Sequence, residues 1–271
     1  MKRSTALQSV GRGRRARRSG TILVALPVVL GLVLAASFVP VQAAERADPK
    51  ATDLLKRMCD YLTALPAFTV KAVNESEVIL IDGQKLDFST VSQVTLKRPN
   101  RLRAHRIDSR DVADLYYDGK SVALHYRNSN FYATKAVPAS LDGALDLLRD
   151  SLTIDIPGAD LLYSDAFDGM TWDVTDAQYV GLESLGDVAV HHLAFRTPSI
   201  DFQVWVQDGD KPLPRKYVIT TKWMTGAPQN GVELTDWNLA PRIDDTVFTF
   251  TPPAGARKID FLRAGALVSE R

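Results

Sequence analysis

Residues 68–97 constrain the fold more than any other stretch, because apolar and polar side chains alternate along most of it. Apolar residues share one face of each half: Phe68, Val70, Ala72, Val78 and Leu80 in the first, and Leu86, Phe88, Val94 and Leu96 in the second. A period of two is typical of a β-strand with one face against a core. Asp82-Gly83 lies between the halves and favours a two-residue turn. The pattern predicts a long β-hairpin.

The hairpin is expected to end at Lys97-Arg98-Pro99-Asn100. Proline lacks the N–H that a β-ladder needs, and it restrains the preceding residue to extended geometry. The strand therefore cannot run far past Pro99, and Arg98 is expected at the rim of the sheet. An arginine at a rim can bond a part of the molecule that moves. Lys97 and Asn100 are interpreted as turn residues.

Further short strands are expected at regular spacing along the chain. They cover about 101–108, 111–117, 121–127, 131–135, 171–183, 188–197, 201–207, 215–224 and 232–239. Turn dipeptides such as Asp118-Gly119 and Asp208-Gly209 separate neighbouring strands, which predicts an antiparallel meander. Side chains of 121–127 alternate in polarity, as in a sheet with one solvated face.

Two helices accompany the strands. One is expected from Pro49 to Leu65-Pro66 and another over about 140–150, because apolar side chains recur there at helical spacing. The apolar stripes are Leu54, Leu55, Met58, Cys59 and Leu62 in the first and Leu141, Ala144, Leu145 and Leu148 in the second. The expected fold class is mainly β with capping helices (α+β), as a single domain over 44–260 with a tail at 261–271.

The first 43 residues have the pattern of an export signal. Residues 1–20 hold seven basic side chains and no acid, residues 21–38 are uncharged and mostly apolar, and Val41-Gln42-Ala43 offers small residues to a signal peptidase. We expect cleavage after Ala43. The alternative is an uncleaved anchor, since the apolar run is just long enough to span a bilayer. Either reading places the rest of the chain in the periplasm.

Loss of the signal changes the charge balance. The whole chain has 33 basic and 32 acidic residues, and without the seven basic residues of the signal it has 26 and 32, a formal net charge of −6. This balance argues against a nucleic-acid partner. The one cysteine, Cys59, cannot form an internal disulfide and is interpreted as a buried, inert thiol. We expect a monomer.

No catalytic or metal-binding motif stands out. The chain has no nucleophile elbow, no HExxH and no spaced carboxylate pair, so we expect a protein without enzymatic activity, metal or cofactor. His191-His192 are adjacent in a strand and point to opposite faces, which disfavours a shared metal ion. Trp205, Trp223 and Trp237 fall in alternating strands and either belong to the ordinary core, which is the favoured reading, or line a cavity.

Several motifs resemble known periplasmic families. Lys97-Arg98-Pro99-Asn100, Tyr117-Asp118-Gly119-Lys120 and the run 248–255 occur in an order similar to that of the periplasmic carrier of outer-membrane lipoproteins. A second set resembles a family of predicted periplasmic proteins, domain of unknown function 2092, over most of 50–260. Its motifs are His192-Leu193-Ala194-Phe195, Asp201 to Trp205, Pro212-Leu213-Pro214-Arg215-Lys216 and Trp237.

The resemblance implies a strongly curved antiparallel sheet, an unclosed half-barrel, with a helical lid on its concave side and acyl chains held between them. In the carrier, the arginine of the matching Lys-Arg-Pro motif bonds backbone carbonyls of the lid. Carried over to Arg98, this implies a latch that sets how readily the lid opens. The plainer interpretation of Arg98 is a solvated charge at a strand end that matters only for the turn.

Three functions remain open. The first is a periplasmic protein that carries or senses a lipid, a lipoprotein acyl chain or another apolar ligand. The second is an interaction module whose sheet edge or concave face binds an envelope protein. The third, ranked last, is an unrecognised hydrolase.

Overall fold

The computed structural model describes residues 47–261 except 110, 153 and 155. The expected signal segment, its cleavage point at Ala43 and nearly all of the expected tail lie outside the described residues. Within the described part, no helix is both long and apolar enough to span a membrane.

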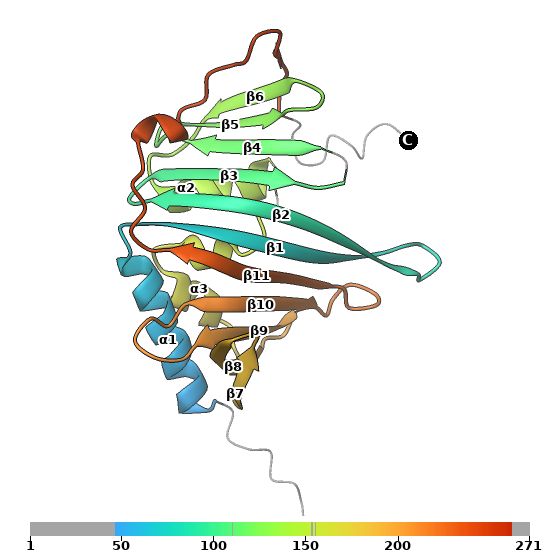
Figure 1. Cartoon of the computed structure of the whole chain (residues 1–271). Helices are drawn as coiled ribbons and strands as arrows, with labels where there is room; N and C mark the ends of the chain where they lie inside the picture. Colours follow the sequence, from blue (N-terminus) through green and yellow to red (C-terminus); the bar gives the residue numbers. More distant parts are fainter. Residues whose placement is uncertain (1–46, 110, 153, 155, 262–271) are drawn as a thin grey trace, which may run out of the picture. The chain divides into compact units, whose positions relative to one another are not determined.

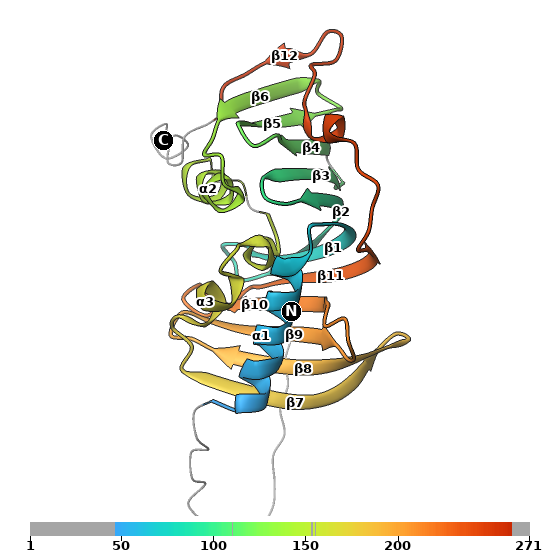
Figure 2. The same ribbon diagram turned by 90° about the vertical axis from the view of Figure 1, so that its left-hand side faces the viewer.

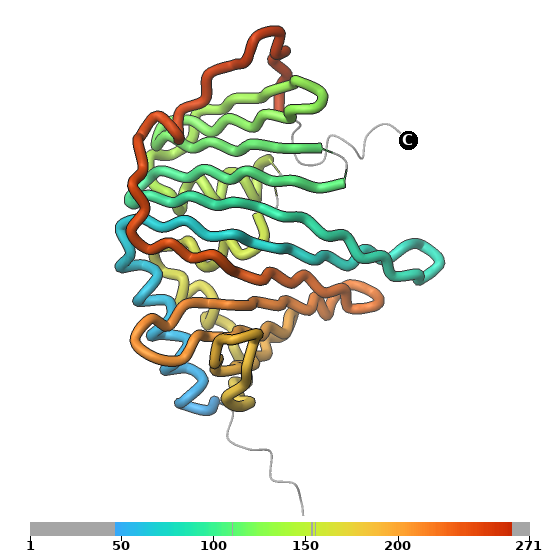
Figure 3. The backbone as a smooth tube through the Cα atoms, viewed as in Figure 1, coloured from blue at the N-terminus to red at the C-terminus, as the bar shows by residue number. Residues whose placement is uncertain are grey.

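One twelve-stranded sheet organises the described residues (Figure 1). Its strands are β1 Ala67–Ile79, β2 Lys85–Lys97, β3 Arg101–Ile107, β4 Val112–Tyr117, β5 Ser121–Tyr126, β6 Phe131–Ala136, β7 Asp176–Leu185, β8 Val188–Arg196, β9 Ile200–Gln207, β10 Pro214–Thr221, β11 Gln229–Asn238 and β12 Arg257–Lys258. Their order is β12-β6-β5-β4-β3-β2-β1-β11-β10-β9-β8-β7. All neighbours pair antiparallel except β12 and β6. Since β7 and β12 are opposite edges, the sheet is not closed, and Figure 3 shows the strand direction turning steadily toward β7.

The expected hairpin is the centre of this sheet. Its two strands pair without interruption, from Phe68 opposite Leu96 to Ile79 opposite Lys85. The connecting loop has three residues, 81–83, rather than the two that the sequence predicted, because Leu80 N–H donates to the Gln84 carbonyl at 2.9 Å. Gly83 takes a φ of +89°, which a three-residue loop requires at its last position and glycine adopts without strain.

Helices cover one face of the sheet (Figure 2). The first, α1 Pro49–Ala64, starts at the N-cap Asp48 and packs against β7, β8 and β9. The others lie between β6 and β7, in residues 138–175, which we call the lid. They are α2 Leu141–Asp146, a π-helical turn Leu147–Ser151, a 3-10 turn Ala159–Leu162 and α3 Ala166–Thr171.

The lid ends later than the sequence predicted. A strand was expected from residue 171, but α3 occupies Ala166–Thr171 and β7 begins at Asp176. Ala166 and Met170 are buried four residues apart, which places both on one helical face. One turn of such spacing is too short to register as a helix in the sequence.

The opposite face carries an irregular segment, residues 239–256, which we call the strap (Figure 2). It includes the 3-10 turn Asp245–Phe248 and leads into β12. Phe248 is fully buried, and Phe250 packs its ring 5.2–5.7 Å from those of Tyr116, His125 and Tyr132. The sheet is therefore a layer between the lid and α1 on one side and the strap on the other.

Candidate functional site

The helix-covered face of the sheet is apolar, as alternation of residues 68–97 predicts. Phe68 and Leu96 from the central hairpin are buried there together with lid leucines. The lid leucines in this core are Leu141, Leu145, Leu148, Leu152 and Leu161. The Tyr117 hydroxyl also donates to the Pro138 carbonyl at 3.0 Å and ties the start of the lid to β4. The lid thus fills most of the face that it covers.

Two cavities remain between the lid and strands β9 to β11. The smaller has a volume of about 240 Å³ and the larger about 510 Å³. They adjoin, because both are lined by Arg149, Asp160, Tyr163, Tyr217 and Ile219. Apolar side chains such as Ile154, Ile156 and Val232 line the smaller one. Together they have the size of a small-ligand site, and the larger cavity adds charged groups to the apolar wall of the smaller one.

Polar groups at the cavities are bonded to one another. Tyr163 donates its hydroxyl to Asp146 at 2.9 Å and accepts from Arg149 at 3.0 Å. Burial and the hydrogen bond to Asp146 raise the pKa of Tyr163. Burial also raises the pKa of Tyr217, with a further contribution from Asp160. Both phenols therefore remain neutral donors at physiological pH.

Arg98 lies at the rim of the sheet beside the lid. Its Nη2 donates to the backbone carbonyl of Leu162 at 3.3 Å, at the end of the 3-10 turn. Burial lowers the pKa of Arg98, and the nearby Asp142 carboxylate opposes that effect. Arginine stays charged at any physiological pH, so this contact joins a permanent cation to a lid carbonyl.

The flanking residues of the same corner make contacts that the sequence did not indicate. Asn100 donates its side-chain amide to the Ala139 carbonyl of the lid at 3.1 Å. Lys97 pairs with Asp245 of the strap at 2.5 Å. The chain reverses at this corner, with β2 ending at Lys97 and β3 starting at Arg101. Residues 97–100 therefore touch both the lid and the strap.

The three tryptophans occupy different surroundings, and none of them lines either cavity. Trp205 stacks on His192 at 4.1 Å and donates its indole N–H to Glu183. Trp237 packs on Phe68 with ring centroids 5.2 Å apart. Trp223 was expected in a strand, but β10 ends at Thr221, and Trp223 is 74% exposed in the following turn.

The paired histidines point to opposite faces, as adjacent strand residues must. His191 bonds Tyr179 and Asp208, whereas His192 bonds Glu183 and Gln203. Among the described residues, no group of three or more histidine, cysteine or acidic side chains is arranged to hold a metal ion.

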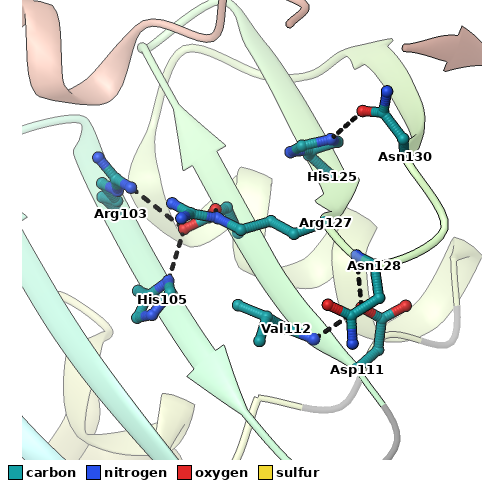
Figure 4. Close-up of polar contacts among 9 residues, drawn as sticks. Arg103, His105, Asp111, Val112, His125, Arg127, Asn128 and Asn130 are labelled. Carbon is teal, nitrogen blue, oxygen red and sulfur yellow. Dashed lines mark hydrogen bonds and ion pairs between the residues drawn. The ribbon is translucent and has the colours of Figure 1, made fainter. Parts of the chain in front are cut away.

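A buried charge cluster lies on the strap side of the sheet (Figure 4). The Asp114 carboxylate is fully buried and meets Arg103 at 3.1 Å, His105 at 2.9 Å and also Arg127. Burial alone would raise the pKa of Asp114, but hydrogen bonds from Arg127, His105 and Arg103 outweigh it and lower the pKa. Sequence reasoning missed this cluster, whose only signal is charged side chains on one face of β3 and β4 and directly after β5.

Solved structures with a similar backbone share little sequence with this chain. An uncharacterized conserved protein from Thermus thermophilus is 10% identical, with a TM-score of 0.47 and coverage of 78% of this chain and 99% of that one. LprF from Mycobacterium bovis is 14% identical, with a TM-score of 0.44 and the same coverage. A LolA superfamily protein from Nitrosomonas europaea is 13% identical, with a TM-score of 0.38 and coverage of 74% and 97%.

No curated protein matches the chain. One family model matches residues 51–262, a range that includes the central hairpin, the lid, the strap and the motifs of residues 192–237. This match confirms the resemblance to a family of predicted periplasmic proteins that the sequence motifs indicated. The chain belongs to the family described as predicted periplasmic protein (DUF2092).

Proposed function

We propose that this protein is a periplasmic, non-enzymatic binding protein that holds an apolar ligand, such as a lipid or a lipoprotein acyl chain, between the lid and the sheet. The observation that carries the proposal is the pair of adjoining cavities beneath the lid. The match to a family described as predicted periplasmic proteins supports the periplasm as the compartment. In this structure the lid leucines are buried against the sheet, and we interpret this arrangement as the closed state of the lid.

Ligand access requires the lid to move. The free volume accommodates part of an acyl chain, and displacement of the leucine stripe of α2 exposes the apolar face beneath for the rest. Each methylene buried there stabilises the complex by roughly 0.8 kcal/mol. A ligand can therefore compensate for the apolar contacts that the lid loses when it opens.

The direct test is native mass spectrometry of gently purified protein, followed by titration with the neutral apolar dye Nile red. The proposal expects either a co-purified apolar molecule or saturable dye binding. A protein that carries no co-purified apolar molecule and also fails to bind the dye would contradict the proposal.

Arg98 has the role of a latch in this proposal, because its guanidinium holds a carbonyl at the end of a lid turn. Arg98→Leu is expected to change the dissociation rate of bound dye at least about threefold, while the free energy of unfolding stays within about 1 kcal/mol. Lys97→Gln is the matched control, because it removes a cation from the same corner that contacts the strap instead of the lid. Equal dissociation rates in both variants would leave Arg98 as a turn residue only.

An envelope protein-interaction module is the second candidate, supported by apolar side chains at the tip of the central hairpin. Val78, Leu80 and fully exposed Ile81 project there, and the hairpin extends past its neighbours in Figure 1. The exposed Trp223 follows β10 in the adjacent loop, where a side chain at Gly226 would touch Ile79. Crosslinking in cells through this tip should recover one dominant partner if the second function holds, with or without a ligand.

A further inference from the structure

Carboxylates dominate the charged lining of the two cavities. They belong to Asp142, Asp146, Asp160, Asp165 and Asp173. Among the described residues, Arg149 is the one cation that lines either cavity, and it already donates to Asp146 and to Asp150 at 3.0 and 2.8 Å. Arg98 lines neither cavity. A negatively charged head group entering here would meet carboxylates and no cation that is free of a partner.

An independent feature lies in the smaller cavity. Asn74 follows Phe68, Val70 and Ala72 on the apolar parity of β1, so it faces the lid, and it lines this cavity. Only 7% of Asn74 is exposed, and its side-chain carbonyl has no hydrogen-bond partner, whereas its amide nitrogen donates to Ser76 at 3.1 Å. Buried amide oxygens are nearly always bonded to a donor. This acceptor calls for an N–H or O–H group.

We propose that the ligand is an amphiphile without negative charge, whose polar part carries hydrogen-bond donors, such as a long-chain amine, amide or alcohol. The inference rests on the proposed function and specifies the chemistry of that site. The donor group bonds Asn74 or the cavity carboxylates, and the apolar chain contacts the face that the lid leucines cover. A free fatty acid or an anionic phospholipid is excluded by repulsion from the carboxylates.

The test compares twelve-carbon probes that differ only in the head group: dodecylamine, dodecanamide and dodecanoate, each below its micelle concentration. Their affinities are measured by displacement of Nile red and by calorimetry. Dodecanoate is expected to bind about tenfold or more weakly than the amine and the amide. The difference between amine and carboxylate should shrink as salt increases, because salt screens charge repulsion at a site open to solvent.

Variants separate the two features. The double variant Asp165→Asn/Asp173→Asn removes two of the carboxylates. It should reduce the ratio of the affinities for dodecylamine and dodecanoate about threefold or more. Asp187→Asn/Asp210→Asn is the matched control, because it makes the same change at exposed turns outside the cavities. Asn74→Leu should weaken the binding of dodecanamide about threefold or more relative to the binding of Nile red, because the hydrogen-bond acceptor is lost.

The outcomes distinguish this inference from the function beneath it. If dodecanoate binds as tightly as dodecylamine to the unmodified protein, the ligand class is wrong although the binding function stands. If the amine, the amide, the carboxylate and Nile red all fail to bind, the proposed function fails and this inference fails with it. The comparison of probes needs no variant, so it stays decisive if Asn74→Leu does not fold.

Discussion

Single residues in this protein separate two kinds of buried polarity. Asp114 has three partners around one carboxylate, whereas Asn74 leaves its carbonyl unbonded. A carboxylate buried with partners on several sides contributes to stability in its ionised form. A lone buried acceptor beside a cavity costs stability, and in our proposal a donor group of the ligand bonds it. The first therefore belongs to the framework and the second to the site.

Asp114→Asn is expected to lower the free energy of unfolding by about 2–3 kcal/mol at neutral pH, because charged hydrogen bonds are lost and three cationic or polar partners lose their acceptor. Urea denaturation measures the change. Asp187→Asn, at an exposed turn, should change it by less than about 0.5 kcal/mol. A loss of that small size in Asp114→Asn would show that the cluster does not stabilise the sheet.

The pH dependence of this effect has a defined sign. Because the pKa of Asp114 is lowered in the folded state, its contribution is fully present above the unfolded-state value of about 3.9. The contribution is lost as pH falls through the folded-state pKa. The stability difference between the unmodified protein and Asp114→Asn should therefore shrink as pH falls below about 4. A difference that grows as pH falls below about 4 would contradict the assignment.

Among the elements, the strands and the first helix of the lid were predictable, and the rest of the lid was not. The helix expected over about 140–150 is present as Leu141–Asp146 and the π-helical turn Leu147–Ser151. The central hairpin follows from strict alternation over two long strands, which places each side chain on a face without ambiguity. The lid is built from helical pieces of four to six residues, Leu141–Asp146, Leu147–Ser151, Ala159–Leu162 and Ala166–Thr171. The later pieces, Ala159–Leu162 and Ala166–Thr171, are too short to show helical periodicity, and their positions are set by packing on the sheet.

Site residues follow the same division. Arg98 could be placed at a rim because Pro99 must end the strand, yet its contact with Leu162 depends on where an irregular turn settles. Asn74 was visible as a polar residue on an apolar parity, but a sequence cannot show that its carbonyl lacks a partner. The expected strand at Trp223 is wrong because the chain turns after Thr221.

The strap is an element with a test of its own. Phe250→Ala removes the ring that packs on Tyr116, His125 and Tyr132, and should cost about 1–3 kcal/mol, less than for a fully buried phenylalanine. Hydrogen exchange should rise at Arg257, whose amide donates to the turn before β6, and at Ile259, whose amide donates to β6. Thr249→Ala, at an exposed neighbouring position, is the control. Faster exchange throughout the lid as well would contradict a strap that is independent of the lid.

At the scale of the whole molecule, the proposed function requires the lid to open while the sheet stays folded. The sheet has a continuous ladder of backbone hydrogen bonds from β7 to β12, whereas α3 is held mainly by packing on α1 and the neighbouring turn. Segments of this kind open at a lower free energy than central strands. The two events can be separated by the amount of surface that each exposes.

Cys59 reports on that separation, because it lies in α1 at a crevice shared with Ala166 and Phe167 of α3. It is buried, and burial raises the pKa of its thiol to about 12, so the native thiol is almost entirely protonated and unreactive at pH 8. Labelling by a disulfide reagent then requires opening. If the lid opens alone, the logarithm of the labelling rate should rise only gently with urea concentration at low urea. Its slope should be less than about half of that expected for global unfolding, whose urea dependence is measured by tryptophan fluorescence.

A thiol introduced at an exposed hairpin position, Ser184→Cys, should label at once and verifies the reagent. Arg98→Leu should raise the Cys59 labelling rate without changing the slope of global unfolding, because the latch contact is lost and the sheet is intact. Cys59 labelling with the full slope of global unfolding would mean that the lid and the sheet come apart together. A carrier whose lid cannot open without unfolding could neither load nor release a ligand, so that result would contradict the proposed function at its mechanical step.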